Sequence, residues 1–309
     1  ISTGSDEDEA NAICDSIKTE IKINKGAFKD FAVLYRTNAQ SRMLEQTMMR
    51  EGLPYNIVGG TKFYDRKEVK DVLAYLTLVC NPNDNIALKR IINFPVRGIG
   101  EKSIKIFNDL ALEKGISLFD SLKSCRDIKL RGKQQDSIEN FYLSINKFHD
   151  LLDTLDCKEL LRTLLEEFNI ENYYKNNPAE QDRYNNIQEL KLSIDRFAEK
   201  SNGSLKEFLQ EISLYTDLDD WDDKKNSVTL MTIHGSKGLE FSTVFVTGLE
   251  QGLFPLIRMD DDIDQLEEER RLFYVAVTRA MERVYLLNAK YRRKFGALNT
   301  SSFVQSEFL

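Results

Sequence analysis

The sequence predicts an α/β protein that is built on a parallel sheet and interrupted by an all-helical insertion. Two observations predict this class: short apolar runs alternate with helical periodicity near both ends of the chain, and the middle shows helical periodicity alone. We divide the chain into residues 1–80, the first part of the α/β domain; residues 81–226, the helical insertion; and residues 227–309, the second part of the α/β domain.

The first part shows strand and helix patterns in alternation. Short apolar runs bounded by turn residues predict buried strands, and apolar residues that recur every three or four positions predict helices. The expected order is strand 31–35, helix 40–50, strand 55–58 and helix 66–79. Gly52 and Pro54 end the first helix, and Gly59 and Gly60 close the second strand.

The second part shows the same alternation after a helical middle. We expect strands at 228–233, 243–247 and 284–287, with one long helix over residues 264–282. Between the two parts, leucines recur at threes and fours and no alternating strand pattern appears. The polar stretches 81–84 and 217–226 are expected to be hinges at the ends of the insertion.

Composition and charge limit the possible functions only loosely. Hydrophobic residues make up 41% and charged residues 30% of the 309, which is typical of a globular protein. The net charge of −7 is a weak argument against nucleic-acid binding, because much acid is concentrated in residues 217–223 and 260–264, which we expect to be solvated loops.

The cysteines and the apolar runs indicate where the protein works. Four scattered cysteines and only two histidines predict no metal site and a reducing, cytoplasmic location. No apolar run is long enough to span a bilayer, so we expect no membrane partner. The chain begins with Ile1 rather than Met, which indicates a segment of a longer protein.

Three segments carry residue types that suit nucleotide chemistry. Residues 232–241 form a glycine-containing loop after a predicted strand, and α/β proteins place ligands at such strand ends. A plain turn would also use these glycines, but the loop holds a histidine, a lysine, hydroxyls and a glutamate as well. That density of polar groups favours a ligand-binding loop.

The other two segments each present an arginine. Arg279 is expected near the end of the long helix in an apolar turn, where a guanidinium is costly without an anionic partner. A phosphate would serve as that partner; the alternative is an ordinary surface charge. Tyr35 and Arg36 end the first strand, which suits a base stacked on a ring and a phosphate held by a guanidinium fork.

Together these segments resemble the helicase motifs of superfamily 1, in order and in spacing. Residues 35–42 resemble motif IV, residues 59–71 the motif that follows it, residues 232–241 motif V and residues 271–280 motif VI. The resemblance covers nearly the whole chain. Residues 93–100, Asn-Phe-Pro-Val-Arg-Gly-Ile-Gly, favour DNA helicases of the UvrD/PcrA/Rep type over the RecB/AddA nucleases, which share motifs V and VI.

The resemblance implies a RecA-like domain of the P-loop NTPase type, the second of two motor domains that hold ATP and Mg²⁺ between them. It implies that Tyr35 stacks on the adenine and that Glu240 bonds the ribose. Arg36 and Arg279 would be catalytic arginine fingers that reach the γ-phosphate. Two guanidiniums would neutralise charge on the transferred phosphoryl group only when the motor domains close.

The resemblance also implies contacts with single-stranded DNA and with single/double-strand junctions, and 3′ to 5′ movement along the strand. Phe63 or Tyr64 could offer a stacking ring, although a core position is equally expected for Phe63. A glycine turn at Gly98 and Gly100 opens a helix that would grip the duplex. The implied DNA-binding residues are Gly59, Gly60, Lys62, Phe63, Arg66, Gly98, Gly100, Ser103, Thr232 and His234.

Two expected features are absent from the sequence. No G-x-x-x-x-G-K-[ST] phosphate-binding loop occurs, and no acidic Mg²⁺-binding motif is evident. We therefore expect the chain alone neither to hydrolyse ATP nor to unwind DNA, with the N-terminal motor domain of the same polypeptide supplying the phosphate cradle and the metal ligands. A smaller departure is Leu256-Ile257, where the family often has His-Ser.

Two other functions stay open at this point. The chain could be an ATP-independent module that binds DNA or a protein through its helical insertion, indifferent to changes at Arg279. It could also be the helicase part of a RecB/AddA-type nuclease-helicase, which requires a nuclease domain after Leu309. The pathway served stays open among repair, replication restart and plasmid replication.

Overall fold

The computed structural model describes residues 1–201, 203–218, 226–256, 263–292 and 301–309. These residues form two compact units, which we call the sheet unit (residues 1–63 and 218–309) and the helical unit (residues 64–217). An α/β fold with a parallel sheet and an all-helical insertion is therefore confirmed. The predicted loops at the two acidic runs, and Ile257, fall mostly or wholly outside the described residues.

The boundaries of the insertion differ from the prediction. The helical unit begins at Tyr64 and ends at Asp217, rather than at residues 81 and 226. Helix α3 (Lys67–Cys80) was assigned to the α/β domain, but it packs on other helices of the helical unit and buries Val72, Leu76 and Val79 among them. Sequence periodicity shows that such a helix has an apolar face, but it does not show which neighbour covers that face.

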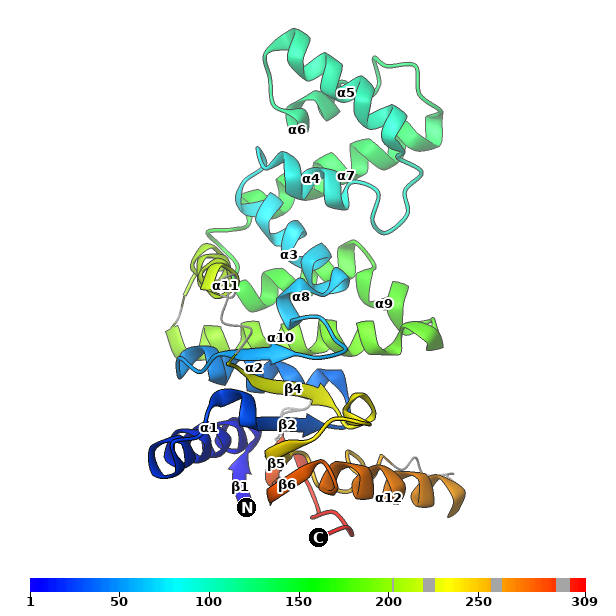
Figure 1. Cartoon of the computed structure of the whole chain (residues 1–309). Helices are drawn as coiled ribbons and strands as arrows, with labels where there is room; N and C mark the ends of the chain where they lie inside the picture. The colour runs from blue at the N-terminus through cyan, green and yellow to red at the C-terminus, as the bar shows by residue number, and fades with distance from the viewer. Residues whose placement is uncertain (202, 219–225, 257–262, 293–300) are drawn as a thin grey trace. The chain divides into compact units, whose positions relative to one another are not determined.

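The sheet unit contains a five-stranded sheet in which every neighbouring pair of strands is parallel (Figure 1). In spatial order the strands are β3 (Tyr55–Ile57), β4 (Val228–Thr232), β2 (Phe31–Tyr35), β5 (Phe241–Val246) and β6 (Ala280–Leu286). Strand β2 lies in the middle and is buried over its whole length, as its unbroken apolar run predicts.

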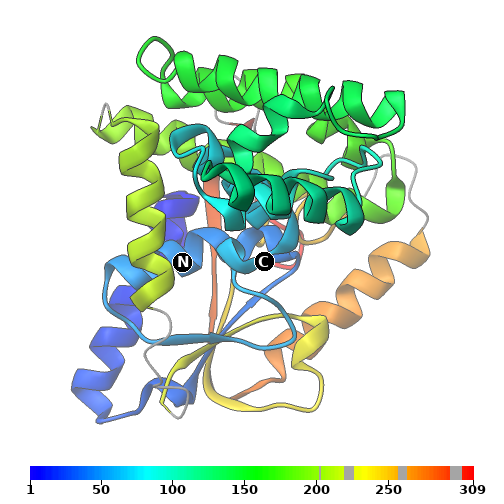
Figure 2. The ribbon, with the colours of Figure 1, turned by 90° about the horizontal axis from the view of Figure 1, so that it is seen from above.

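Helices cover both faces of this sheet (Figures 1 and 2). They are α1 (Asp6–Asn24) and α2 (Ser41–Arg50) on one face and α12 (Ile263–Val277) on the other. Because side chains alternate along a strand, β2 sends Val33 and Tyr35 to the α1/α2 face and Ala32 and Leu34 to the α12 face. The two faces therefore have separate cores.

The C-terminal end of α12 lies earlier than predicted. The helix was expected to continue to residue 282, but it ends at Val277 and β6 begins at Ala280. The backbone N–H of Phe241 donates to the Arg279 carbonyl over 2.9 Å, and Ala280 pairs with Phe241 in the sheet. The residues after Arg279 have a local propensity to continue the helix, but they pair with β5 instead. Arg279 therefore lies in the turn between α12 and β6.

A second, smaller sheet was not predicted. It contains β1 (Ser2–Ser5), β7 (Asn288–Arg292) and β8 (Ser301–Ser302) in the order β1-β7-β8. Helix α1 was also missed, although the sequence carries a signal for its start. The Asp8 N–H donates to Ser5 Oγ over 3.1 Å and the Ser5 N–H donates to Asp8 Oδ2 over 2.9 Å, which is a capping box.

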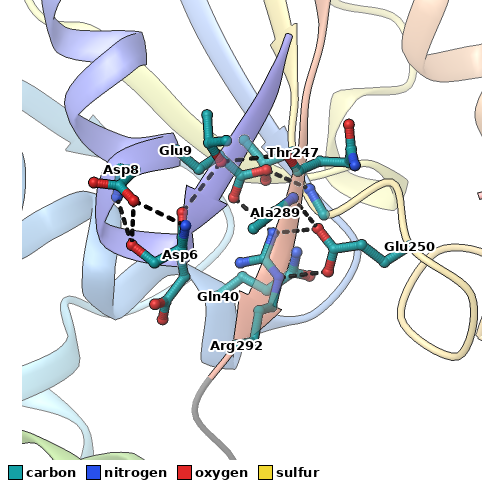
Figure 3. Close-up of polar contacts among 12 residues, drawn as sticks. Asp6, Asp8, Glu9, Gln40, Thr247, Glu250, Ala289 and Arg292 are labelled. Carbon is teal, nitrogen blue, oxygen red and sulfur yellow. Dashed lines mark hydrogen bonds and ion pairs between the residues drawn. The ribbon is translucent and has the colours of Figure 1, made fainter. Parts of the chain in front are cut away.

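A buried ion network links β7 of the small sheet to helix α1 and to the loop after β5 (Figure 3). Arg292 of β7 donates to Glu250 Oε2 over 2.5 Å and to Glu9 Oε2 over 2.7 Å. The two carboxylates also accept backbone N–H groups, from Ala289 and from Gly248. Side-chain exposure is 0% for Glu250 and 4% for Glu9, so the Arg292 cation compensates charges that water cannot reach.

The helical unit contains helices only, in its described part (cyan to yellow-green in Figures 1 and 2). After α3 these are α4 (Asn85–Ile91), α5 (Glu101–Lys114), α6 (Leu118–Ser121), α7 (Gly132–Asp150), α8 (Cys157–Glu167), α9 (Ile170–Lys175), α10 (Gln181–Ser201) and α11 (Leu205–Leu218). Its core includes the rings of Tyr75, Phe141 and Phe168, with the Arg97 guanidinium 5.0 to 5.9 Å from their centroids.

All four cysteines are free thiols, and burial raises the pKa of each. The pKa of Cys14 rises to about 12 and that of Cys80 to about 11. We expect a thiol reagent at pH 8 to label the folded protein slowly, because only about one Cys14 in ten thousand is then a thiolate. Labelling with and without urea tests this, and fast labelling of Cys14 in the folded protein would contradict it.

No helix among the described residues is both long and apolar enough to cross a membrane.

Candidate functional site

Arg36 follows the central strand β2 and is fixed through both its backbone and its side chain. The N–H groups of Arg36 and Thr37 both donate to Gln40 Oε1, over 3.0 and 2.9 Å. The Arg36 side chain donates through Nε and Nη2 to Glu269 Oε1 of helix α12, over 3.0 and 2.8 Å. The strand end and the helix are thus joined by a side-on ion pair whose side chains are 20% and 7% exposed.

Gly248 provides the space that Gln40 occupies. Its φ is +73°, which favours glycine, and a Cβ on this residue would lie 2.2 Å from Gln40 Nε2. A side chain at position 248 would therefore displace Gln40, and with it the hydrogen bonds that hold the backbone of Arg36.

Arg279 is held differently, by neutral groups only. Its Nε donates to the Val275 carbonyl over 3.1 Å, its Nη1 to the Leu239 carbonyl over 3.0 Å, and its Nη2 to Thr278 Oγ1 over 3.2 Å. No carboxylate of the described residues forms an ion pair with it. The Arg279 guanidinium is thus held in a fixed orientation before any ligand binds, and no carboxylate of the described residues compensates its positive charge.

Helix α12 contacts both arginines, which lie at opposite ends of the sheet. Arg36 follows the carboxyl end of β2, whereas Arg279 precedes the amino end of β6. Their guanidiniums nevertheless contact the same helix, at Glu269 and Val275, which are six residues apart. Six residues correspond to about 9 Å along the helix axis. The resemblance implied that both arginines reach one phosphate, and that stays a prediction.

Tyr35 does not lie beside Arg36 as expected. The resemblance implied that its ring stacks on a base, but the ring is 1% exposed within the core on the α1/α2 face. Arg36 extends toward α12 on the other face. The physical reason is the alternation of neighbouring side chains along a strand. We therefore correct this expectation: as the chain is folded here, the face of Tyr35 is not available to a base.

Glu240, the residue implied for ribose binding, lies next to Arg279. It is exposed and directly precedes β5, and it follows Leu239, whose carbonyl accepts from Arg279. The structure thus places Glu240 and Arg279 at the same end of the sheet, whereas Arg36 lies at the other end.

Two of the implied DNA-binding segments come together at the carboxyl ends of neighbouring strands. Gly59 and Gly60 follow β3; Thr232 ends β4, which pairs with β3 in parallel, and His234 lies in the short turn after β4. Gly59, Gly60 and His234 are exposed, and Gly59 has a φ of +71°. This proximity follows from the parallel pairing of β3 and β4, because the carboxyl ends of parallel strands lie at the same edge of a sheet.

The residues that follow this glycine turn are less accessible than expected. Phe63 is 1% exposed and its N–H donates to Glu45 Oε2 over 2.9 Å, and Tyr64 is also buried. Arg66 is buried too and donates to Asn186 Oδ1 over 2.7 Å. The expected stacking ring at Phe63 or Tyr64 is therefore wrong for this structure, and the guanidinium of Arg66 is engaged inside the helical unit.

Lys62 keeps a partly exposed side chain beside the same turn. Its Nζ lies 5.5 Å from the centroid of the Tyr55 ring, within the sheet unit. A cation held over a ring at the surface can still reach a phosphate.

The glycine turn of the helical unit is built as predicted. Gly98 has a φ of +72°, and Gly100 is the exposed N-cap of α5. Ser103, which was implied as a DNA contact, is 6% exposed and lies mostly inside. The turn therefore offers backbone groups to a ligand rather than the Ser103 hydroxyl.

Asn93 and Arg97 shape this turn, although no local sequence pattern indicates a role for either. Asn93 Oδ1 accepts the N–H groups of Arg97 and Ile99, over 2.9 and 3.0 Å. Arg97 Nη1 donates to the carbonyl of Phe94 over 2.7 Å, and its guanidinium lies against aromatic rings. The pattern of one asparagine bonding the backbone four and six residues later is visible only in the folded loop.

Comparison with known proteins identifies the family to which the chain belongs. The family model described as the UvrD-like helicase C-terminal domain matches residues 1–291. The ATP-dependent DNA helicase PcrA of Bacillus subtilis is 42% identical over 284 residues, which cover 89% of this chain and 38% of that protein. PcrA of Staphylococcus aureus strain Mu50 is 41% identical, with 98% of this chain and 42% of that protein covered.

The chain therefore spans about two fifths of the length of the curated relatives that it matches. The parallel sheet interrupted by helices is the RecA-like fold with its helical insertion that the motifs implied. This chain belongs to the UvrD-like helicase C-terminal domain family.

Proposed function

We propose that this chain is the C-terminal part of an ATP-dependent DNA helicase that moves 3′ to 5′ along single-stranded DNA and unwinds duplexes. In this proposal Arg36 and Arg279 are arginine fingers, and Glu240 bonds the ribose. The observation that carries the proposal is the Arg279 guanidinium, which three neutral groups orient and which has no carboxylate partner among the described residues. The relatives named PcrA support it, because they are ATP-dependent DNA helicases by name.

The chemistry of the pair suits a transferred phosphoryl group. The three neutral acceptors around Arg279 fix its orientation without cancelling its charge, so an anion that reaches it finds a preorganised donor. Such a donor is most effective when water is excluded, because electrostatic attraction is stronger at low effective dielectric. Closure of a second motor domain over this surface would exclude that water and couple hydrolysis to movement.

The phosphate cradle and the Mg²⁺ ligands belong to a second motor domain in this proposal. Among the described residues, no group of three or more His, Cys, Asp and Glu side chains is placed to hold a metal ion. The sequence has no phosphate-binding loop. The N-terminal motor domain of the same polypeptide would supply both, as in a site shared between two domains.

DNA would be held at two separate surfaces. The edge formed by Gly59, Gly60, Thr232 and His234 presents two exposed glycines, a half-buried hydroxyl and an exposed imidazole, which suit the backbone of a single strand. The turn at Gly98 and Gly100 presents the start of a helix, which suits a duplex phosphate at a junction. A reducing compartment such as the cytoplasm is supported by the four free thiols.

DNA-stimulated ATP hydrolysis tests this proposal. We expect no turnover by the chain alone with excess single-stranded DNA, and clear turnover by the longer protein that contains it. Turnover by the chain alone that disappears in Arg279→Ala would mean that a complete ATP site exists here, and the shared-site proposal would be wrong. Duplex binding by the longer protein without any ATP hydrolysis would favour an ATP-independent binding module instead.

A further inference from the structure

The two arginines of the site differ in net charge, although both are guanidiniums. Arg279 contacts only neutral acceptors, as described above. Arg36 forms an ion pair with Glu269, whose side chain is 7% exposed. A positive and a negative charge in direct contact nearly cancel at a distance, so the attraction of this site for an anion comes mainly from Arg279.

The geometry of the ion pair leaves one side of Arg36 available. Glu269 takes Nε and Nη2, and within the described part of the chain no hydrogen bond is made by Nη1. A guanidinium held side-on keeps the direction of its remaining donors, because the group is planar and rigid. Glu269 thus fixes where Nη1 points, while Gln40 fixes the backbone from which the side chain starts.

Glu269 also holds a third segment. Its Oε2 accepts the N–H of Leu256 over 3.0 Å, at the position where the sequence departs from the usual family pattern. One carboxylate therefore joins the end of β2, helix α12 and the loop after Phe254. A substitution that removes the negative charge of Glu269 and one that only shortens its side chain should have different effects. The two contributions can therefore be separated by substitution.

We propose that Glu269 is a positioning residue that aims Arg36 Nη1 at the transferred phosphoryl group and neutralises Arg36 in the ground state. This inference rests on the proposed function. In physical terms, Arg279 provides an uncompensated charge both for binding and in the transition state, whereas the benefit of Arg36 as an aligned donor appears mainly in the transition state. Alignment of this kind affects kcat more than affinity.

Two substitutions of Glu269 in the longer, DNA-stimulated protein test the two roles. Glu269→Gln removes the charge that neutralises Arg36, so affinity for a non-hydrolysable ATP analogue should rise about threefold, as for one partly exposed charge. The same variant should lower kcat about 10-fold, because the amide keeps one acceptor oxygen and turns an NH2 donor toward either the Arg36 guanidinium or the Leu256 N–H. Glu269→Asp keeps the charge but loses reach, so kcat should fall while affinity stays unchanged.

A double-mutant cycle separates positioning from a merely structural role. In an Arg36→Ala background, Glu269→Gln should have no further effect on kcat, because the side chain that it positions is absent. Equal and independent losses in the two backgrounds would overturn the inference. So would an unchanged kcat in both Glu269 variants while Arg279→Ala abolishes turnover, a result that leaves the proposed function intact. Absence of nucleotide binding and turnover in the unmodified protein would instead refute the proposed function.

Discussion

Replacing Arg279 by alanine is expected to lower the DNA-stimulated kcat of the longer protein by about 10³-fold or more, the range measured when an arginine finger is removed. The reason is that its guanidinium is the one cation of the pair without a carboxylate partner among the described residues, and three neutral acceptors already orient it. Arg279→Lys should recover little, because an ammonium cannot bond Val275 and Leu239 while it also presents a donor fork.

A neighbouring arginine provides the matched control for this experiment. Arg271 lies on α12 as well, its side chain is 78% exposed, and it forms a surface ion pair with Glu268. Arg271→Ala should leave kcat unchanged. Steady-state kinetics and equilibrium binding of a non-hydrolysable ATP analogue should be measured for both variants. Equal activity of Arg279→Ala and the unmodified protein would exclude Arg279 from the hydrolysis step.

Replacing Arg292 by alanine is expected to lower the free energy of unfolding by about 3–5 kcal/mol, the cost of leaving buried charge uncompensated. Glu250 and Glu9 lose their shared cation in this variant, and neither side chain is reached by water (Figure 3). Burial works to lower the pKa of Arg292, but the two glutamates outweigh it and raise that pKa. Arg292 therefore stays charged. The decrease in the free energy of unfolding of Arg292→Ala should be measured by urea unfolding.

The stability that Arg292→Ala loses should depend on pH in a defined direction. Burial raises the pKa of Glu9, and Arg292 works in the opposite direction. Without Arg292 the folded protein should bind protons more readily, so acidification stabilises Arg292→Ala relative to the unmodified protein. The difference in unfolding free energy should therefore narrow as pH falls toward the ordinary glutamate pKa. A difference that widens on acidification would contradict this account.

An exposed ion pair serves as the control for stability. Arg50 of α2 contacts Glu7 of α1 over 3.0 Å, and the side chains are 43% and 31% exposed. Arg50→Ala breaks a link between segments as Arg292→Ala does, but its partner stays in water. The expected loss is below about 1 kcal/mol. Similar losses in both variants would mean that burial of the Arg292 network is not what makes it costly to break.

Local patterns located most elements of the sheet unit. Residues 31–35 form a strand with the predicted bounds, and helix α2 differs from its prediction by one residue. These segments were predictable because one face or both faces of each must be apolar, whatever their neighbours are. The helicase motifs, the glycine turns and the absence of a phosphate-binding loop are likewise properties of the sequence alone.

Contacts between distant segments were not predictable in the same way. The assignment of α3 to the helical unit, the end of α12 at Val277 and the second sheet all depend on which segment pairs with which. The roles of Gln40 and Glu269 belong to this class as well. A glutamate in a charged run has no local signal that distinguishes it from its neighbours, since only folding places Glu269 against Arg36.

The sequence by itself determined the fold class and the family, and it singled out the two arginines that we propose to bind a phosphate, because residue type and spacing carry that information. The tertiary structure alone decided which side chains are accessible. It placed Tyr35 and Phe63 inside and paired Arg36 with a carboxylate, while Arg279 received only neutral partners. The physical reason is that exposure and charge compensation depend on neighbours far away in the chain, which no local pattern specifies.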